Sequence, residues 1–219
     1  MADVRDATER LTSKQITAST VEKGYNLFIL DNLDALTSED VEEAIASLPL
    51  WRREKTCLFK HEQGRKECAY SYLLLCQALQ KVYGMDVQPE FGYGEHGKPF
   101  LKDYADIHFN LSHCRNAIAC AVSDRPVGID VERIGRFKES VARYVLNDAE
   151  YHHVVTSSAP DEEFTRLWTQ KEAIVKLTRG VALTMTSEIF YIIRKCQFIL
   201  MCIPTKGMLS VWQLSFNRF

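Results

Sequence analysis

The stretch IHFNLSHCRNAIACAVSDRPVGIDVE, residues 107–132, decides the fold class of this chain. Its runs IHFNL, AIACAV and VGIDVE follow a period of two, which is typical of β-strands with one buried face. Turn-prone residues at 114–116 and 124–126 separate the three runs. We therefore expect a meander of three consecutive antiparallel strands.

Helix and strand patterns also precede this stretch. The run YNLFIL at 25–30 predicts a strand, and a helix-start signature begins at Thr37. Residues from about 51 to 83 form a long helical stretch that Gly64 breaks or weakens and that ends at Gly84. The N-terminal part of the chain is therefore expected to combine helices with at least one strand.

Further helical patterns follow the stretch. Residues 139–152 and 162–179 are patterned as helices, and the remainder from 181 is mostly strand-like. Strands and helices thus occur in runs joined by hairpins, without strict alternation of strand and helix. This order favours an α+β fold.

Composition and charge narrow the class of protein. The chain has 219 residues, 46% hydrophobic and 26% charged, a balance typical of globular domains rather than disordered chains. Lys and Arg number 27 against 29 Asp and Glu, and the net charge of −2 argues against a nucleic-acid partner. Residues 1–22 are polar and aperiodic, so we expect them to form a loose extension.

Cysteine usage and hydropathy bear on location. The chain has 7 cysteines, an odd number with no C-x-x-C pair, which favours reduced thiols in the cytoplasm over a disulfide framework. The N-terminus has acidic residues and no apolar segment, so we expect no signal peptide. The apolar runs fall short of the roughly 18 residues of a membrane span, so we expect no membrane partner.

Two carboxylates share one face of the expected strand VGIDVE. Alternation sends Ile129 and Val131 to one face and Asp130 and Glu132 to the other. Like charges two residues apart repel, so removal of either carboxylate is expected to cost little stability. A divalent cation such as Mg²⁺ relieves the repulsion by taking oxygen ligands from both residues. The alternative is an ordinary strand face that is turned to water.

A second candidate pair lies on the expected helix at 162–179. Glu172 and Lys176 stand one turn apart on a flank of its buried stripe. The simplest interpretation is a surface ion pair worth ~0.3–0.5 kcal/mol. The functional interpretation is a third metal carboxylate or general base beside a cation that grips a phosphate.

Ser112 and His113 end the strand FNLSH. They are either polar turn residues or a pair of donors for a phosphate. Adjacent strand residues point to opposite faces, which makes the two residues poorly placed as nucleophile and base of a hydrolase triad.

Basic residues recur in two other segments. The loop at 93–99 has two glycines and Lys98, which could meet a phosphate or an adenine edge, but it lacks the spacing of a P-loop. Arg52, Lys55 and Lys66 lie in the first long helical stretch, where a solvated helix face is the ordinary interpretation.

In this order, four motifs resemble the 4′-phosphopantetheinyl transferases, and specifically their long, surfactin-type branch: GKPF (97–100), FNLSHC (109–114), VGIDVE (127–132) and LWTQKEAIVK (167–176). The resemblance implies two similar α+β lobes related by a pseudo-twofold, with the active site between them. We therefore expect an N-terminal lobe at 23–125 and a C-terminal lobe at 126–219. A faint similarity between 107–122 and 206–216 agrees with such a repeat.

The resemblance also implies an activity. The family moves the phosphopantetheine arm of coenzyme A onto a serine of an apo acyl or peptidyl carrier protein. It uses Mg²⁺ and releases adenosine 3′,5′-bisphosphate. The length of this chain is similar to that of the monomeric two-lobed members, so we expect a monomer.

Site residues follow from the same resemblance. Asp130, Glu132 and Glu172 match the metal-binding carboxylates, Glu172 also matches the base for the serine, and Lys176 matches the lysine on the transferring phosphate. Ser112 and His113 match the pair near the 3′-phosphate of coenzyme A. The full set expected to bind coenzyme A is Arg52, Lys55, Lys66, Lys98, Pro99, Ser112 and His113.

Two alternatives remain open at this point. A non-catalytic module that binds coenzyme A or a carrier protein would carry the same residues. A metal-dependent hydrolase of nucleotide pyrophosphates would use the same metal ligands with water as the acceptor. Because carrier proteins are usually acidic, weak candidates for a docking surface are the basic residues Arg115, Arg133, Arg136 and Lys138.

Overall fold

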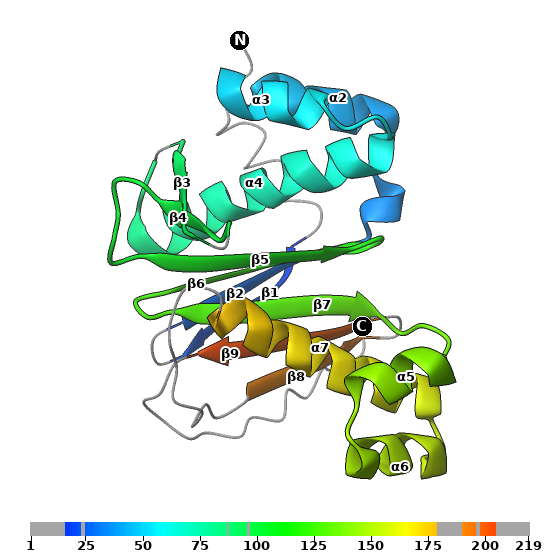
Figure 1. The fold of residues 1–219 in the computed structure, drawn as a ribbon. Helices are drawn as coiled ribbons and strands as arrows, with labels where there is room; N and C mark the ends of the chain where they lie inside the picture. Colours follow the sequence, from blue (N-terminus) through cyan, green and yellow to red (C-terminus); the bar gives the residue numbers. More distant parts are fainter. Residues whose placement is uncertain are drawn as a thin grey trace.

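The structure, a computed structural model, describes residues 16–22, 25–86, 88–95, 97–178, 190–195 and 198–204. In these residues two antiparallel sheets stack face to face, and helices cover their outer faces (Figure 1). The α+β class expected from the sequence is confirmed.

The larger sheet has the strand order β1 (Ile16–Glu22), β2 (Tyr25–Asp31), β6 (Ala117–Ser123) and β5 (His108–Cys114). All neighbouring strands are antiparallel. The expectation of a loose extension at 1–22 is wrong for its last seven residues, which form the edge strand β1. ITASTVE is rich in Ile, Thr and Val, which suit strands, and an edge strand needs only one partner.

The expected three-strand meander is wrong in its third strand. Strands β5 and β6 do form a hairpin, but β7 (Val127–Arg133) leaves this sheet. It pairs with β9 (Phe198–Pro204), which pairs in turn with β8 (Phe190–Lys195). The reason is topological, because β2 and β5 already occupy both edges of β6. A local pattern does not show that β2, far away in sequence, takes the edge that β7 would need.

Side chains, rather than a strand ladder, join β5 to β7. The Asn110 side chain accepts a hydrogen bond from the Ile129 amide at 2.8 Å, and Ser112 Oγ accepts one from the Val131 amide at 3.2 Å. Both acceptors lie on β5 and both amides on β7. We call this line of contact the seam; it connects the two sheets at the level of the candidate site.

The longest N-terminal helix packs on the larger sheet, and the two helices before it pack on that helix. Helix α2 (Ser38–Ser47) begins at Thr37 with the expected capping box. The helical stretch expected at 51–83, with a break or weak point at Gly64, is two helices, α3 (Leu50–Cys57) and α4 (Glu62–Tyr83). The chain breaks before Gly64, which lies inside α4, and α4 ends as expected at Gly84, whose φ is 64°. A short 3-10 helix, η1 (Leu33–Ala35), precedes α2, and a hairpin of β3 (Phe91–Tyr93) and β4 (Pro99–Leu101) follows α4.

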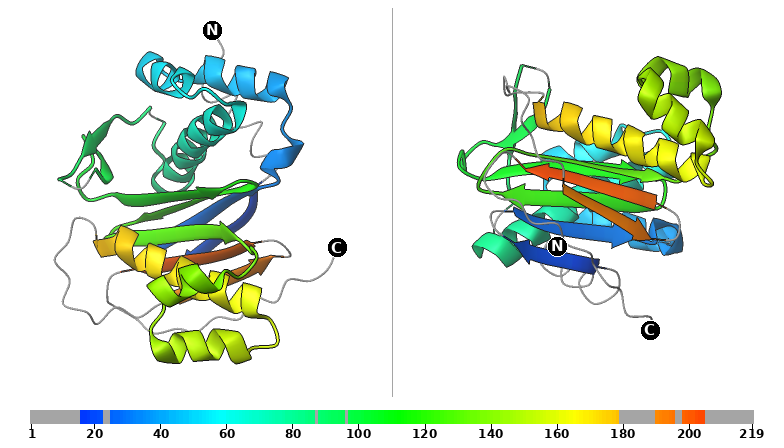
Figure 2. Two further views of the ribbon diagram at one scale, coloured as in Figure 1. Left: turned by 45° about the vertical axis from the view of Figure 1, so that its right-hand side comes forward. Right: turned by 90° about the horizontal axis from the view of Figure 1, so that it is seen from below.

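The last C-terminal helix packs on the smaller sheet, and the two helices before it form a small apolar cluster with that helix. The helix expected at 139–152 is divided into α5 (Glu139–Val145) and α6 (Asp148–Thr156). The division arises because Asn147 caps α6, with Glu150 completing a capping box. The helix expected at 162–179 is α7 (Pro160–Thr178), and it crosses β7 on the outer side (Figures 1 and 2).

Two apolar layers hold the fold together. One lies between α2, α4 and the larger sheet, and includes Tyr72, Leu75 and Phe28. The other lies between the sheets, where the small side chains of β6 meet Ile129 and Val131 of β7. Small residues let the sheets approach closely, and this brings β7 beside β5.

The larger sheet comes from residues 16–123, and the β7–β9–β8 sheet from residues 127–204. The lobe boundaries at 23–125 and 126–219 stay predictions, and the similarity at 206–216 lies outside the described residues. No described helix is long and apolar enough to cross a membrane.

Candidate functional site

A pocket of about 260 Å³ opens where β5, β7 and α7 meet. It gathers six of the residues that the sequence singles out, although they come from three separate elements. The lining residues are Leu111, Ser112, His113, Asp130, Glu132, Trp168, Glu172 and Lys176. Three of the four motifs thus contribute residues to the pocket lining, namely FNLSHC, VGIDVE and LWTQKEAIVK. The motif GKPF contributes none.

Close contact between β7 and α7 makes this convergence possible. A Cβ at Gly128 would lie 2.2 Å from the Ala173 carbonyl oxygen and 2.7 Å from the Leu177 amide nitrogen. Real Cβ atoms do not approach backbone so closely, so this position requires glycine. The missing side chain lets α7 lie directly against the strand that carries the carboxylates.

Asp130 and Lys176 form a short ion pair inside the pocket. The Lys176 ammonium donates to Asp130 Oδ1 at 2.6 Å and to Ser112 Oγ at 2.8 Å. The side chain of Asp130 is 4% exposed and that of Lys176 28%. The expectation of a strand face with two unpaired like charges is therefore wrong for Asp130. Its partner is Lys176, which the sequence instead suggested as a surface partner for Glu172.

The second oxygen of Asp130 has a different environment. Oδ2 is buried and has no hydrogen-bond partner among the residues that the structure describes. An unpartnered buried carboxylate oxygen is costly, because it has lost water without gaining a donor. This oxygen is therefore a ready acceptor for a cation or a donor that enters the pocket.

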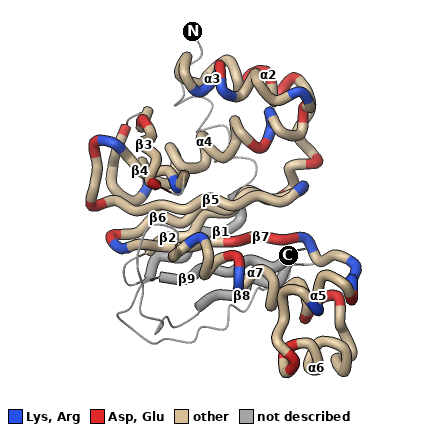
Figure 3. The backbone as a smooth tube through the Cα atoms, viewed as in Figure 1, with Lys and Arg blue, Asp and Glu red and all other residues tan. Residues whose placement is uncertain are grey.

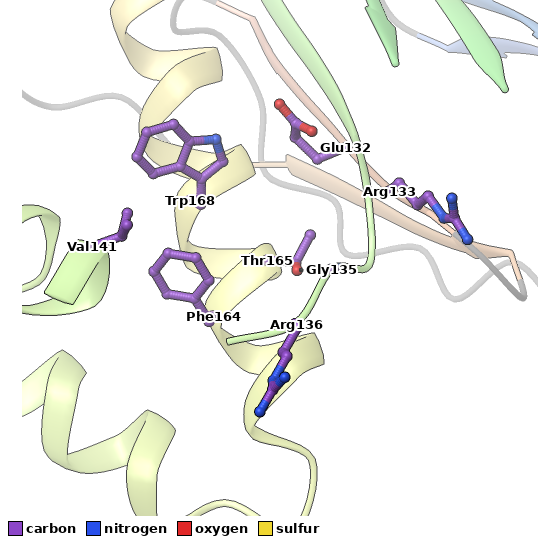
Figure 4. Close-up of a pocket in the computed structure, with 8 residues that line it drawn as sticks. All are labelled: Glu132, Arg133, Gly135, Arg136, Val141, Phe164, Thr165 and Trp168. Carbon is purple, nitrogen blue, oxygen red and sulfur yellow. Dashed lines mark hydrogen bonds between the residues drawn. The ribbon is translucent and has the colours of Figure 1, made fainter. Parts of the chain in front are cut away.

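Glu132 lies next to Asp130 on the same face of β7. Burial raises the pKa of Glu132, and the negative charges of Asp130 and Glu172 raise it further. Lys176 and a hydrogen bond from Trp168 oppose this shift. Both residues also line a neighbouring pocket, and Figure 4 shows the indole nitrogen of Trp168 facing the Glu132 carboxylate there. The three carboxylates thus form a site of concentrated negative charge.

The raised pKa predicts how stability changes with pH in the metal-free protein. The folded state holds the Glu132 proton more tightly than the unfolded state, in which the pKa of the carboxyl group is near 4.5. As the pH rises through the raised pKa of Glu132 in the folded state, the free energy of unfolding of the wild type should fall relative to that of Glu132→Gln. The variant should therefore be more stable than the wild type above the folded pKa, and the two proteins should be nearly equally stable below the unfolded pKa. Urea unfolding across the pH range measures this, and parallel curves for the two proteins would contradict it.

His113 and Ser112 face different surroundings, as alternation requires. Ser112 is 5% exposed, whereas the His113 side chain is 52% exposed. His113 Nδ1 lies 3.7 Å from the carboxylate of Glu67 on α4. Gln63 in turn donates to Glu67 at 2.7 Å. His113 is therefore accessible to a ligand, and the Glu67 carboxylate is its neighbour.

The expected basic residues of α3 and α4 lie outside the pocket lining. Arg52 is buried; its guanidinium donates to the Cys68 carbonyl at 2.9 Å and lies over the Tyr72 ring. Lys66 is also buried, and its ammonium donates to two backbone carbonyls near η1 at 3.2 Å. Lys55 is exposed and donates to the Tyr93 hydroxyl at 3.0 Å. Two of these three cations are thus committed to backbone carbonyls.

Lys98 and Pro99 lie at the edge of the site. The Lys98 ammonium donates to the Lys176 carbonyl at 2.8 Å and to the Val127 carbonyl at 3.4 Å. Burial lowers the pKa of Lys98. The Lys176 carbonyl belongs to the last turn of α7, where carbonyls lack helical partners and favour a cation. Lys98 therefore anchors the end of α7, and Pro99 begins the neighbouring strand β4.

The sequence also contains site residues that were not singled out. Trp168 belongs to the motif LWTQKEAIVK without an expected role of its own, yet it lines the pocket and donates to Glu132. A signal was present, because Trp168, Glu172 and Lys176 follow one another at intervals of four and so share a helix flank. Nothing in the local pattern indicates Glu67, which reaches His113 only through the packing of α4.

Comparison with known proteins gives consistent matches. A family model described as the 4′-phosphopantetheinyl transferase superfamily matches residues 126–200. A 4′-phosphopantetheinyl transferase of Bacillus subtilis is 31% identical over 157 residues, which cover 69% of this chain and 70% of the relative. The 4′-phosphopantetheinyl transferase Sfp of Bacillus subtilis (strain 168) is 27% identical over 156 residues, with the same coverage.

A second group of relatives matches a shorter stretch. The 4′-phosphopantetheinyl transferase AcpT of Salmonella typhimurium is 38% identical over 121 residues, which cover 52% of this chain and 59% of the relative. The segment from β7 to α7, which supplies the carboxylates and Lys176, lies within the residues that the family model matches. On this sequence similarity and this site, the chain belongs to the 4′-phosphopantetheinyl transferase superfamily.

Proposed function

We propose that this protein transfers the 4′-phosphopantetheine arm of coenzyme A to a serine hydroxyl of an apo acyl or peptidyl carrier protein. The serine oxygen forms a bond to the phosphorus that carries pantetheine, and the pyrophosphate bond breaks. The serine proton passes to a base, and adenosine 3′,5′-bisphosphate leaves. Membership of the superfamily supports this assignment. The observation that carries it is the single pocket that holds Asp130, Glu132, Glu172 and Lys176.

We propose that Asp130, Glu132 and Glu172 hold Mg²⁺. The unpartnered Oδ2 of Asp130 and the raised pKa of Glu132 fit a hard cation that takes carboxylate oxygens. No three His, Cys, Asp or Glu side chains among the described residues already form a group that could hold a metal ion. The Lys176 ammonium supplies the positive charge beside Asp130 in this state. When bound, Mg²⁺ would neutralise charge on the pyrophosphate.

Lys176 and Glu172 carry the remaining chemistry in this proposal. Lys176 has three N–H donors, of which Ser112 and Asp130 occupy two, so within the described part of the chain the third can serve a phosphate oxygen. Its position one turn after Glu172 places cation and carboxylate at the same end of α7. Glu172 is the proposed base that accepts the serine proton.

We propose that His113 binds the 3′-phosphate of coenzyme A, with Lys55, Lys98 and Pro99 lining the nucleotide. The exposure of His113 at the pocket rim supports this role. We assign Arg52 and Lys66 to holding the fold, because both are buried against backbone carbonyls. This differs from the coenzyme A contacts that the resemblance implies for them.

The His113 role predicts a selective loss. His113→Ala should weaken coenzyme A binding by about 10- to 100-fold, because a charge-assisted hydrogen bond contributes about 1.5–3 kcal/mol. Dephospho-coenzyme A lacks the 3′-phosphate, so its binding should change little. Calorimetric titration of both ligands against both proteins measures the difference. Equal losses for the two ligands would show that His113 contacts another part of the molecule.

We further propose that the protein acts as a cytoplasmic monomer without nucleic-acid or membrane partners. Cys57, Cys68, Cys76 and Cys114 form no disulfide within the described part of the chain, in keeping with a reducing compartment. For the carrier protein, a basic stretch at the end of β7 and in the connection after it supports an acidic partner (Figure 3). Its members are Arg133, Arg136 and Lys138.

A single experiment separates the proposed function from its alternatives. The protein is incubated with coenzyme A, Mg²⁺ and an apo carrier protein, and the intact mass of the carrier is measured. Addition of one phosphopantetheine supports the transferase. Cleavage of coenzyme A without modification of the carrier would indicate a hydrolase, and binding without either change would indicate a non-catalytic module.

A further inference from the structure

Ser112 occupies a central position in the candidate site. It lies on β5 at the seam and is 5% exposed. Its hydroxyl donates to Asp130 Oδ1 at 2.8 Å and accepts from the Lys176 ammonium at 2.8 Å. It also accepts from the Val131 amide at 3.2 Å. One hydroxyl therefore connects β5, β7 and α7 at a single point.

These three bonds use the whole hydrogen-bonding capacity of the side chain. A serine hydroxyl has one hydrogen to donate and two lone pairs that accept. The hydrogen goes to Asp130, and the lone pairs receive Lys176 and Val131. A phosphate oxygen only accepts, so Ser112 could bind a phosphate only by giving up its bond to Asp130.

We propose that Ser112 is a positioning residue for the metal-binding half of the site and does not bind the coenzyme A phosphate. Its hydroxyl fixes Oδ1 of Asp130 and the ammonium of Lys176, which leaves Oδ2 of Asp130 turned to the entering cation. This inference rests on the proposed function, and it separates Ser112 from His113, its expected partner at the 3′-phosphate.

Asn110 provides a matched control on the same strand. It lies two residues before Ser112, is 7% exposed, and accepts from the Ile129 amide at 2.8 Å. It therefore holds β7 across the seam as Ser112 does, but its bond goes to a backbone amide that is outside the candidate site. Asn110→Ala thus removes only a hydrogen bond across the seam, whereas Ser112→Ala also removes the contacts that position Asp130 and Lys176.

The experiment measures binding, without turnover. Ser112→Ala, Ser112→Cys and Asn110→Ala are titrated by calorimetry with Mg²⁺, coenzyme A and dephospho-coenzyme A. Cysteine fills the same space but bonds weakly, so it keeps the test valid if the alanine variant folds poorly. We expect Mg²⁺ affinity to fall about 10- to 100-fold in both Ser112 variants and to stay near wild type in Asn110→Ala.

The two coenzyme A ligands distinguish positioning from phosphate binding. Both Ser112 variants should weaken coenzyme A and dephospho-coenzyme A by the same factor. A loss confined to coenzyme A, with Mg²⁺ affinity unchanged, would overturn the inference and return Ser112 to the 3′-phosphate. Loss of Mg²⁺ affinity in Asn110→Ala equal to that in Ser112→Ala would also overturn it.

Failure of the proposed function would be seen separately. Wild-type protein that binds neither Mg²⁺ nor coenzyme A would overturn the proposed function itself. The urea unfolding of Ser112→Ala, Lys176→Met and the double variant still tests the positioning contact. We expect Ser112→Ala to cost less stability in the Lys176→Met background than in the wild type. Additive costs would overturn the positioning of Lys176 by Ser112.

Discussion

Asp130→Asn is expected to lower the rate of phosphopantetheine transfer by roughly 10²- to 10³-fold, as removal of a single preorganised group that stabilises transition-state charge typically does. Asparagine has the size of aspartate but lacks its charge. It should therefore weaken the hold on Mg²⁺ and on Lys176 together. Intact-mass assays of carrier modification at increasing Mg²⁺ measure the loss.

The same variant should be less stable than the wild type. Removing one partner of a buried ion pair costs about 3–5 kcal/mol. The 28% exposure of Lys176 allows water to screen its charge, so the loss in free energy of unfolding should fall below that range. The double variant Asp130→Asn/Lys176→Met should recover part of it. A single variant as stable as the wild type would restore the sequence-based expectation of a repulsive strand face.

Glu172→Gln is expected to lower kcat by about 10²- to 10⁴-fold while coenzyme A binding changes little. The amide keeps the size of the side chain and one oxygen ligand, but it cannot accept the serine proton. Single-turnover transfer and calorimetric binding are measured on the same preparations. Glu163→Gln serves as the control, because Glu163 lies on the same helix but pairs with Arg166, away from the pocket lining.

Magnesium distinguishes the two roles of Glu172. A ligand-only role would let high Mg²⁺ restore the rate of Glu172→Gln. A base role leaves the rate low at every Mg²⁺ concentration. Full activity at ordinary Mg²⁺ would remove Glu172 from both roles.

Much of the site was predictable because its motifs are local. Period two in VGIDVE correctly places Asp130 and Glu132 on one face of β7, and a period of four places Glu172 and Lys176 on one flank of α7. These spacings depend only on backbone geometry, which neighbouring residues fix. The six site residues that the sequence singles out and the structure brings together are all in such short motifs.

The rest depends on contacts between segments that are distant in sequence. No local pattern indicates that β2 pairs with β6 and so excludes β7 from the larger sheet. Burial of Arg52 and Lys66 likewise depends on packing against α4 and η1, and a basic stretch looks the same whether it is solvated or buried. The pairing of Asp130 with Lys176 needs the close approach that Gly128 permits, and only the assembled fold shows it.

The seam also determines which backbone amides of β7 become exposed to water when the two sheets separate. The amides of Ile129 and Val131 point across it, so the alternate amides of β7 point to β9. Hydrogen exchange at 129 and 131 therefore reports separation of the two sheets, whereas exchange at 130 and 132 reports loss of the β7–β9 ladder. One strand thus carries two independent probes, and a substrate that touches both β5 and α7 would slow exchange at the first pair before the second.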